Sequence, residues 1–315
     1  GGYQLSNLPK ISIIGAGNVG ASAAYRVLEL NLADVVLLDI VEGLPQGKSL
    51  DLSQMVAVSG SSSRIMGTND YEDTKESDVV IVTSGLARKP GMSRDDLITT
   101  NTKIIKEVIE KVVQNSPNSI LIIVTNPLDA MTYVAHKVSG FSKQKVMGMA
   151  GILDASRFKA FLAMELKVAA SEIDTLVLGG HGDDMVPLPR YTSVHGIPVS
   201  QLLSAEKITA CVDRAKVGGG EIVKLMGTSA YYAPAAGVTE MVDAIVLDQH
   251  RILPCAVYLE GEYGINGLFV GVPTKLAASG LEEIVQIKLS AEEKSMLKNS
   301  ADAVKELVEV MHNSQ

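Results

Sequence analysis

Short apolar runs alternate with helix-like stretches through the first half of the chain. Four runs rich in Val, Ile and Leu are expected to form buried strands, at 11–14, 35–38, 78–83 and 120–124. Ahead of the last run, apolar residues recur at helical spacing, at Ile104, Ile105, Val108, Ile109, Val112 and Val113. The sequence Asn115-Ser116-Pro117 ends that helix. This order predicts an α/β fold, with a parallel sheet covered by helices on both faces.

The second half of the chain shows a different pattern. Helices are expected at 156–166 and 207–225, followed by three short apolar runs at 255–260, 268–272 and 284–289. Breaks rich in glycine separate these runs, which favours an antiparallel meander.

A last amphipathic helix is expected at the end of the chain. Ser290 and Glu293 have the spacing of a capping box, which marks the start of a helix. The apolar residues that follow share one face, namely Leu297, Ala301, Val304, Leu307, Val308 and Met311. We place a domain boundary near residues 149–151, so that 1–150 forms a parallel, doubly wound domain and 151–315 an α+β domain.

Length and charge narrow the function classes. A chain of 315 residues is expected to form one large or two medium domains. It carries 28 Lys+Arg against 36 Asp+Glu, a net charge of -8, which argues against a nucleic-acid-binding protein because such a protein needs a basic face. A small anionic substrate remains compatible with this charge, since a few arginines can reverse the field inside one cleft.

The cysteines and the apolar runs indicate the compartment. Cys211 and Cys255 lie far apart and show neither a CxxC pair nor a metal-ligand spacing, so we expect no disulfide framework, no metal site and a reducing compartment. No apolar run reaches the ~20 residues of a membrane span, and the first ten residues lack the apolar core of a signal peptide. We therefore expect a cytoplasmic protein that does not bind membranes.

A glycine-rich turn follows the first predicted strand and opens a helix that runs to about Asn31. The turn has the pattern G-x-G-x-x-G, formed by Gly15, Ala16, Gly17, Asn18, Val19 and Gly20. Asp39 follows nineteen residues after Gly20, at the end of the next strand. This combination is the fingerprint of a dinucleotide-binding Rossmann domain, and the carboxylate favours NAD over NADP. The alternative is an ordinary glycine-rich turn with an aspartate that caps a strand end.

Candidate chemistry is concentrated in three polar segments. His181 stands among glycines, which can present its ring to a cavity, although an ordinary loop histidine is the alternative. Asp154 and Arg157 are three residues apart and can share a helix face, where the carboxylate would orient an imidazole and the guanidinium would bind a carboxylate. From spacing alone, a surface ion pair is the better explanation for these two residues.

The third segment follows the 78–83 strand and contains Arg88, Lys89 and Arg94. Loops at the carboxyl ends of parallel strands bind ligands, so this segment is a candidate lid that brings arginines to an anion. A solvated basic loop is an equally good explanation. Asn126 ends the 120–124 strand at the same sheet edge and either contacts a ligand or caps the next helix.

In this order, the motifs resemble the NAD-dependent malate dehydrogenases of the lactate dehydrogenase-like group, within the lactate/malate dehydrogenase family. The resemblance runs over nearly the whole chain. It rests on GAGNVG at 15–20, GLARKPGMSRDDL at 85–97, VTNPLD at 124–129, GILDASRF at 151–158, GGHGDDMVPL at 179–188 and SAYYAPAA at 229–236. Two departures are Ala87, where a proline is usual, and the stretch 225–229, which is about one residue short.

The resemblance implies a role for each candidate residue. His181 would accept the proton, Asp154 would pair with it, and Arg157 would bind the C1 carboxylate of the substrate. Arg94 would lie over the reacting oxygen and Arg88 would select the substrate. The positions that match cofactor contacts are Asn101, Val124, Thr125 and Asn126, and Asn126 also matches a substrate contact.

The implied activity is the reversible oxidation of (S)-malate to oxaloacetate with NAD as cofactor. The nearest alternative is an (S)-lactate dehydrogenase on the same scaffold, which usually carries Gln at the position of Arg88. A non-enzymatic NAD-binding regulator would not need His181, Asp154 and Arg157, and a sugar-acid reductase would need a lysine-based site that we do not find. The resemblance further implies a homo-oligomer, a tetramer rather than a dimer.

Overall fold

The computed structural model describes residues 7–87 and 93–313. Its first half is a six-stranded parallel sheet in the spatial order β3-β2-β1-β4-β5-β6. The strands are β1 (Lys10–Ile14), β2 (Asp34–Leu38), β3 (Ile65–Thr68), β4 (Val79–Val82), β5 (Ile120–Ile123) and β6 (Val146–Gly148). The predicted doubly wound sheet is confirmed, with its switch point between β1 and β4, where ligands bind in open α/β sheets.

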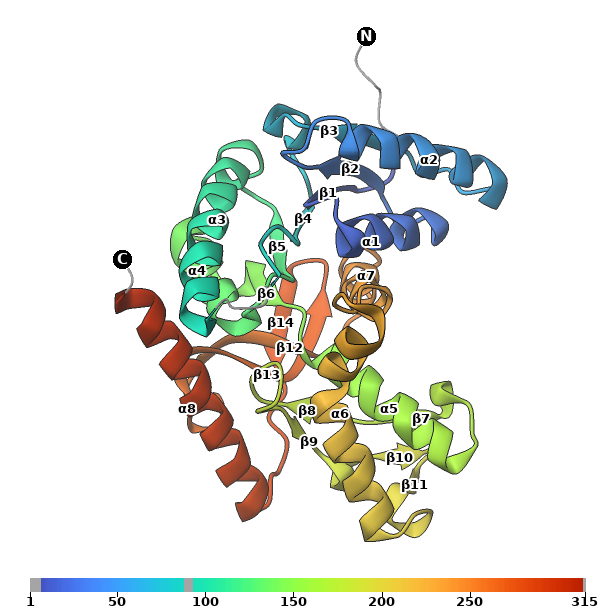
Figure 1. Cartoon of the computed structure of the whole chain (residues 1–315), viewed down its shortest axis with the longest axis vertical. Coiled ribbons are helices and arrows are strands. Elements are labelled where there is room, and N and C mark those ends of the chain that lie inside the picture. Colours follow the sequence, from blue (N-terminus) through green and yellow to red (C-terminus); the bar gives the residue numbers. More distant parts are fainter. Residues whose placement is uncertain (1–6, 88–92, 314–315) are drawn as a thin grey trace.

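Helices cover both faces of this sheet, as predicted (Figure 1). The first-half helices are α1 (Asn18–Glu29), α2 (Leu44–Ser59), α3 (Arg94–Asn115) and α4 (Leu128–Ser139). Strand residues alternate between the faces: Ile11 and Ile13 join the cluster that contains α1, while Ile14 joins the one that contains α3 and α4. Every residue of β4 is buried because both faces are covered.

The second half adds α5 (Gly151–Leu166), α6 (Ala205–Met226), α7 (Tyr232–Val246) and α8 (Ala291–Asn313). Neither α2 nor α7 was predicted, because neither has a clear apolar stripe: α2 buries only Pro45 and Ser49, and α7 is buried along most of its length. Helix α5 begins five residues before the predicted 156–166 segment, and its N-cap Ala150 has no side-chain cap to mark the start.

The meander is made of β12 (Arg251–Glu260), β13 (Asn266–Ala277) and β14 (Gly280–Ile284). It extends the parallel sheet, since β12 pairs with β6 through Ala256 and Gly148. The third predicted strand, at 284–289, is wrong beyond its first residue. Val285 N still donates to Pro273 O of β13 (2.9 Å), but beyond it the hydroxyl of Tyr263 accepts a hydrogen bond from Ile287 N (3.0 Å) and donates one to Val285 O (2.6 Å).

Smaller elements complete the second half. A three-stranded sheet contains β7 (Ile173–Asp174), β10 (Ser193–Val194) and β11 (Ile197–Pro198), and a hairpin contains β8 (Val177–Leu178) and β9 (Val186–Pro187). Short 3₁₀ turns lie at Tyr71–Thr74, Lys143–Lys145, Ala170–Glu172, Pro189–Tyr191, Val199–Gln201 and Glu262–Gly264. Two-residue strands are too short to produce a readable alternation of apolar and polar residues.

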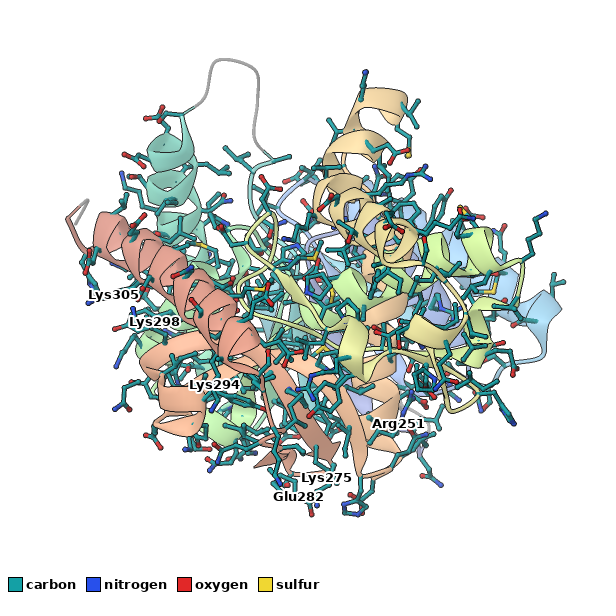
Figure 2. All side chains as sticks on the ribbon, turned by 90° about the horizontal axis from the view of Figure 1, so that it is seen from below. Arg251, Lys275, Glu282, Lys294, Lys298 and Lys305 are labelled. Atoms are coloured by element: carbon teal, nitrogen blue, oxygen red, sulfur yellow. The ribbon has the colours of Figure 1, made fainter. Side chains whose placement is uncertain are left out.

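The predicted capping box and apolar face of α8 are confirmed. Ser290 N donates to the Glu293 carboxylate (2.7 Å), and Glu293 N donates to Ser290 Oγ (3.1 Å). Figure 2 shows Lys294, Lys298 and Lys305 along the outer side of α8, while its predicted apolar residues are buried or half-buried beneath. Within the described ranges, no helix has the length and apolar character required to cross a membrane.

Candidate active site

The glycine-rich turn between β1 and α1 has the geometry of a phosphate cradle. Gly15 has a φ of +114°, and a Cβ there would lie 2.4 Å from Thr83 Oγ1. A Cβ on Gly20 would lie 1.8 Å from Gly15 O, so this glycine permits the close approach of helix and turn. A Cβ on Gly17, in contrast, would meet no heavy atom within 4 Å. The backbone at Gly17 therefore faces open space that a ligand can fill.

The start of α1 fits an anion. Among the described residues, no side chain caps this helix at Gly17, so Asn18, Val19 and Gly20 keep the free N–H groups of its first turn. Such N–H groups, together with the helix dipole, bind the pyrophosphate of a dinucleotide. The residues of the turn thus fit the predicted cofactor.

Asp39 lies at the end of β2 and binds the same turn. One carboxylate oxygen accepts a hydrogen bond from Ala16 N (2.7 Å) and the other accepts one from Val41 N (3.0 Å). Lys48 of α2 donates to Ala16 O (2.6 Å), a contact that the sequence did not predict. Asp39 therefore does cap local backbone, and because each carboxylate oxygen has a second acceptor site, it can still bind ribose hydroxyls.

We expect Asp39 to make NADH strongly preferred over NADPH. A carboxylate and a 2′-phosphate repel each other at hydrogen-bond distance, whereas a ribose hydroxyl donates to the carboxylate. The measurement is kcat/KM for the two cofactors with the same substrate. Equal kcat/KM values for NADH and NADPH would contradict the role given to Asp39. Asp39→Ser should reduce the ratio of kcat/KM for NADH to kcat/KM for NADPH.

His181, Asp154 and Arg157 come together at the start of α5, as predicted. Asp154 lies in the first turn of the helix and is 2% exposed. Its Oδ2 lies 3.0 Å from His181 Nδ1, and its Oδ1 lies 3.7 Å from an Nη atom of Arg157. The alternative of a surface ion pair is therefore wrong, because these side chains are 14% exposed or less.

The surroundings of His181 favour its protonated ring. Burial by itself would lower the pKa of His181, but the charge and hydrogen bond of Asp154, with a further contribution from Asp129, outweigh burial and raise it. Burial also lowers the pKa of the Arg157 guanidinium, while Asp154 opposes that change. The Nε of Arg157 is buried and has no hydrogen-bond partner among the described residues.

Arg157 lies against two of three consecutive glycines, Gly218 to Gly220, in the middle of α6. A Cβ on Gly219 would lie 3.3 Å from an Nη atom of Arg157, and a Cβ on Gly218 would lie 3.3 Å from Arg157 Cδ. A Cβ on Gly220 would meet no heavy atom within 4 Å. Each helical glycine costs about 0.5–1 kcal/mol relative to Ala, so the room at 218 and 219 has a purpose other than helix stability.

This contrast predicts different effects for two neighbouring substitutions. Both Gly219→Ala and Gly220→Ala should raise the melting temperature, because both reduce the freedom of the unfolded chain. Only Gly219→Ala should displace the guanidinium by a few tenths of an ångström, raising KM for the substrate roughly 2- to 10-fold. Steady-state kinetics on both variants measures KM for the substrate. Identical KM values for Gly219→Ala and Gly220→Ala would refute the predicted difference.

The polar groups at the carboxyl edge of β4 and β5 are linked by hydrogen bonds. Asn101 of α3 is fully buried and accepts a hydrogen bond from Leu86 N (2.8 Å). Its amide nitrogen donates to Leu86 O (3.1 Å) and Asn126 O (2.7 Å). Asn101 thus supports the segment around Leu86 and Asn126, and its side-chain amide is used for those contacts.

The other predicted residues at this edge differ in exposure. Thr125 is buried and donates to Ser84 O (2.6 Å), Val124 is half-buried, and the Asn126 side chain is exposed. The segment that begins with Arg88 lies outside the described residues up to 92. Arg94 is the first residue of α3 and lies between the two capping-box residues Ser93 and Asp96, but its side chain also lies outside the description.

Comparison with known proteins agrees with this geometry. The model of the lactate/malate dehydrogenase NAD-binding domain matches residues 9–148, and that of the lactate/malate dehydrogenase alpha/beta C-terminal domain matches 152–314. The chain is 59% identical to a malate dehydrogenase of Heliobacterium modesticaldum over 302 residues, covering 96% of this chain and 98% of the relative. A Salinibacter ruber malate dehydrogenase is 54% identical, with 94% of each chain covered.

Solved structures give the same result. The malate dehydrogenase of Cryptosporidium parvum has a TM-score of 0.95 at 43% identity, covering 97% of this chain and 99% of its own. The lactate dehydrogenase of the same organism, complexed with lactic acid and NAD, has a TM-score of 0.94 at 40% identity, covering 98% and 99%. NAD is confirmed as the cofactor class by the matching NAD-binding domain. The chain therefore belongs to the lactate/malate dehydrogenase family.

Proposed function

We propose that this chain catalyses the reversible, NAD-dependent oxidation of (S)-malate to oxaloacetate. The observation that carries the proposal is the pairing of His181 with Asp154 beside Arg157, at the start of the helix that follows β6 of the NAD-binding sheet. This constellation supplies a proton acceptor and a carboxylate anchor, which are the two groups that a 2-hydroxy acid requires. The chain's malate dehydrogenase relatives, 52–59% identical, support the choice of malate.

His181 is the proposed general acid and base. Because Nδ1 faces Asp154, Nε2 is the ring nitrogen left for the substrate hydroxyl. In malate oxidation Nε2 takes the C2 hydroxyl proton, and Asp154 stabilises the imidazolium that forms. In the reverse direction the protonated ring donates to the carbonyl oxygen. The bound nicotinamide supplies the hydride chemistry.

The arginines are proposed to hold and select the substrate. Arg157 binds the C1 carboxylate through two N–H groups, which orients C2 toward the cofactor side of the site. Arg94 polarises the carbonyl oxygen, and Arg88 balances the second carboxylate of the dicarboxylate. Asn126 contacts substrate and cofactor, and Asn101, Val124 and Thr125 shape the cofactor side. We also propose the division at 149–151 into cofactor and substrate domains, a cytoplasmic location and a homo-oligomer, a tetramer in preference to a dimer.

Comparing kcat/KM for oxaloacetate and pyruvate with NADH tests the function. Pyruvate would leave Arg88 desolvated opposite a methyl group, and sites of this kind discriminate by about 10⁴–10⁵-fold. The chain should therefore reduce oxaloacetate far faster than pyruvate. Arg88→Gln should lose most oxaloacetate activity and gain some with pyruvate. A wild-type preference for pyruvate would establish the (S)-lactate dehydrogenase alternative instead.

A further inference from the structure

The turn that carries His181 is held through three consecutive backbone N–H groups. Gly179 N donates to Gly271 O of β13 (2.9 Å), and Gly180 N donates to Ser300 Oγ of α8 (2.8 Å). His181 N donates to Oδ2 of Asp129, near the start of α4 (2.8 Å). Two of these acceptors are neutral, whereas the one directly beneath His181 is a carboxylate.

A carboxylate at this place is energetically unfavourable. Asp129 is 2% exposed, and its Oδ1 has no hydrogen-bond partner among the described residues. Burial raises the pKa of Asp129 to about 6, although the N–H of His181 opposes the change. An amide or hydroxyl would satisfy the same N–H, as Ser300 does for Gly180, without burying a charge. The presence of a carboxylate at this position therefore points to a role for the charge itself.

We propose that Asp129 is a positioning residue with an electrostatic role: its ionised carboxylate anchors the His181 backbone and, together with Asp154, favours the protonated imidazole ring. This inference rests on the proposed function, because it assigns a role in the proton transfer. Neither the spacing of the motifs nor the pairing of His181 with Asp154 required it.

The charges around His181 come from two helices. From α5, Asp154 favours the imidazolium through its charge and hydrogen bond, and Arg157 disfavours it. From α4, Asp129 favours it. The charge of Asp154 also raises the pKa of Asp129, and the charge of His181 opposes that rise. The buried carboxylates of Asp154 and Asp129 therefore both stabilise the protonated ring of His181.

Asp129→Asn separates anchoring from charge. The Asn carbonyl oxygen can still accept from His181 N, but the negative charge is lost. We expect the inflection in the pH profile of kcat/KM for oxaloacetate to move down by roughly one pH unit. The profile for malate oxidation should shift in the same way. NMR without cofactor can follow the His181 ring, whose resonances are assigned by comparison with His181→Asn. In Asp129→Asn the pKa of this ring should be lower by the same amount. The melting temperature at pH 8 should not fall, because a buried charge is removed.

Ser300→Ala is the matched control. It removes an anchor from the adjacent N–H of Gly180 without changing any charge, so it should lower kcat while leaving the inflection pH in place. If Asp129→Asn loses activity equally at every pH, with the wild-type inflection and His181 titration, Asp129 is only an anchor and the proposal is overturned. A wild type without oxaloacetate activity would instead overturn the proposed function, and the NMR titration would still decide the role of Asp129.

A second measurement covers the case in which Asp129→Asn does not fold. In wild type, the His181 resonances should show a further step near pH 6 as Asp129 ionises beneath the ring. A titration with one step only would count against the proposal as firmly as an unshifted pH profile.

Discussion

Replacing His181 with Asn should lower turnover of oxaloacetate by roughly 10²–10⁴-fold, the usual contribution of general acid–base catalysis. Asn can accept a hydrogen bond but cannot exchange a proton near neutral pH. NADH affinity should stay near the wild-type value, because the ring faces Asp154 on α5 and not the glycine-rich turn at α1. Stopped-flow measurement of NADH binding and steady-state kcat give the two readouts.

His195→Asn is the control for this substitution. The side chain of His195 is 89% exposed, and its φ of +48° is a conformation that Asn adopts readily. Its kcat should match that of wild type. A His181→Asn variant with wild-type kcat would show that His181 is an ordinary loop histidine, whatever its contact with Asp154.

The second large effect is expected at Arg157. Arg157→Lys keeps the positive charge but removes the planar fork that binds a carboxylate through two N–H groups. Losing one charged hydrogen bond costs about 1.5–3 kcal/mol, so kcat/KM for oxaloacetate should fall by roughly 10- to 10²-fold. Much of the loss should appear in KM, with a smaller loss in kcat as C2 is held less well.

Arg190→Lys is the matched control for that change. Arg190 also makes a two-point contact, with Nε and Nη2 on the Glu293 carboxylate at 3.1 and 2.8 Å, but its side chain is 53% exposed. Exposed pairs contribute little, about 0–1 kcal/mol, so this variant should keep wild-type kinetics. If Arg157→Lys kept wild-type kinetics as Arg190→Lys should, Arg157 would not be the residue that binds the substrate carboxylate.

The buried charge at Arg157 and the glycines facing it form one arrangement. Gly218 and Gly219 of α6 leave room for the largely buried guanidinium of Arg157. Asp154, which lies on the same helix as Arg157, keeps this guanidinium in place. A longer side chain at 219 would compete for the space that orients Nη1 and Nη2. With the proposed role of Arg157, we expect substrate affinity to depend on α6 as well as on the residues of the α5 motif.

Local patterns determined the parallel half of the fold and its cofactor site. The strands of this half that were predicted are four- or five-residue runs buried on both faces, and the glycine turn and Asp39 lie within thirty residues of one another. Such features are visible in sequence because each follows from a short stretch of backbone. The spacing of Asp154 and Arg157 likewise determined that they share a face of α5.

Only the tertiary structure decided what surrounds the proton-transfer residue. His181 lies 27 residues after Asp154, 52 after Asp129 and 119 before Ser300, and no pattern along the chain relates them. They meet because α4, α5 and α8 pack against the same extended sheet, with the 179–181 turn between them. The burial that raises the pKa of Asp129, and with it the electrostatic role proposed here, exists only once those layers have assembled.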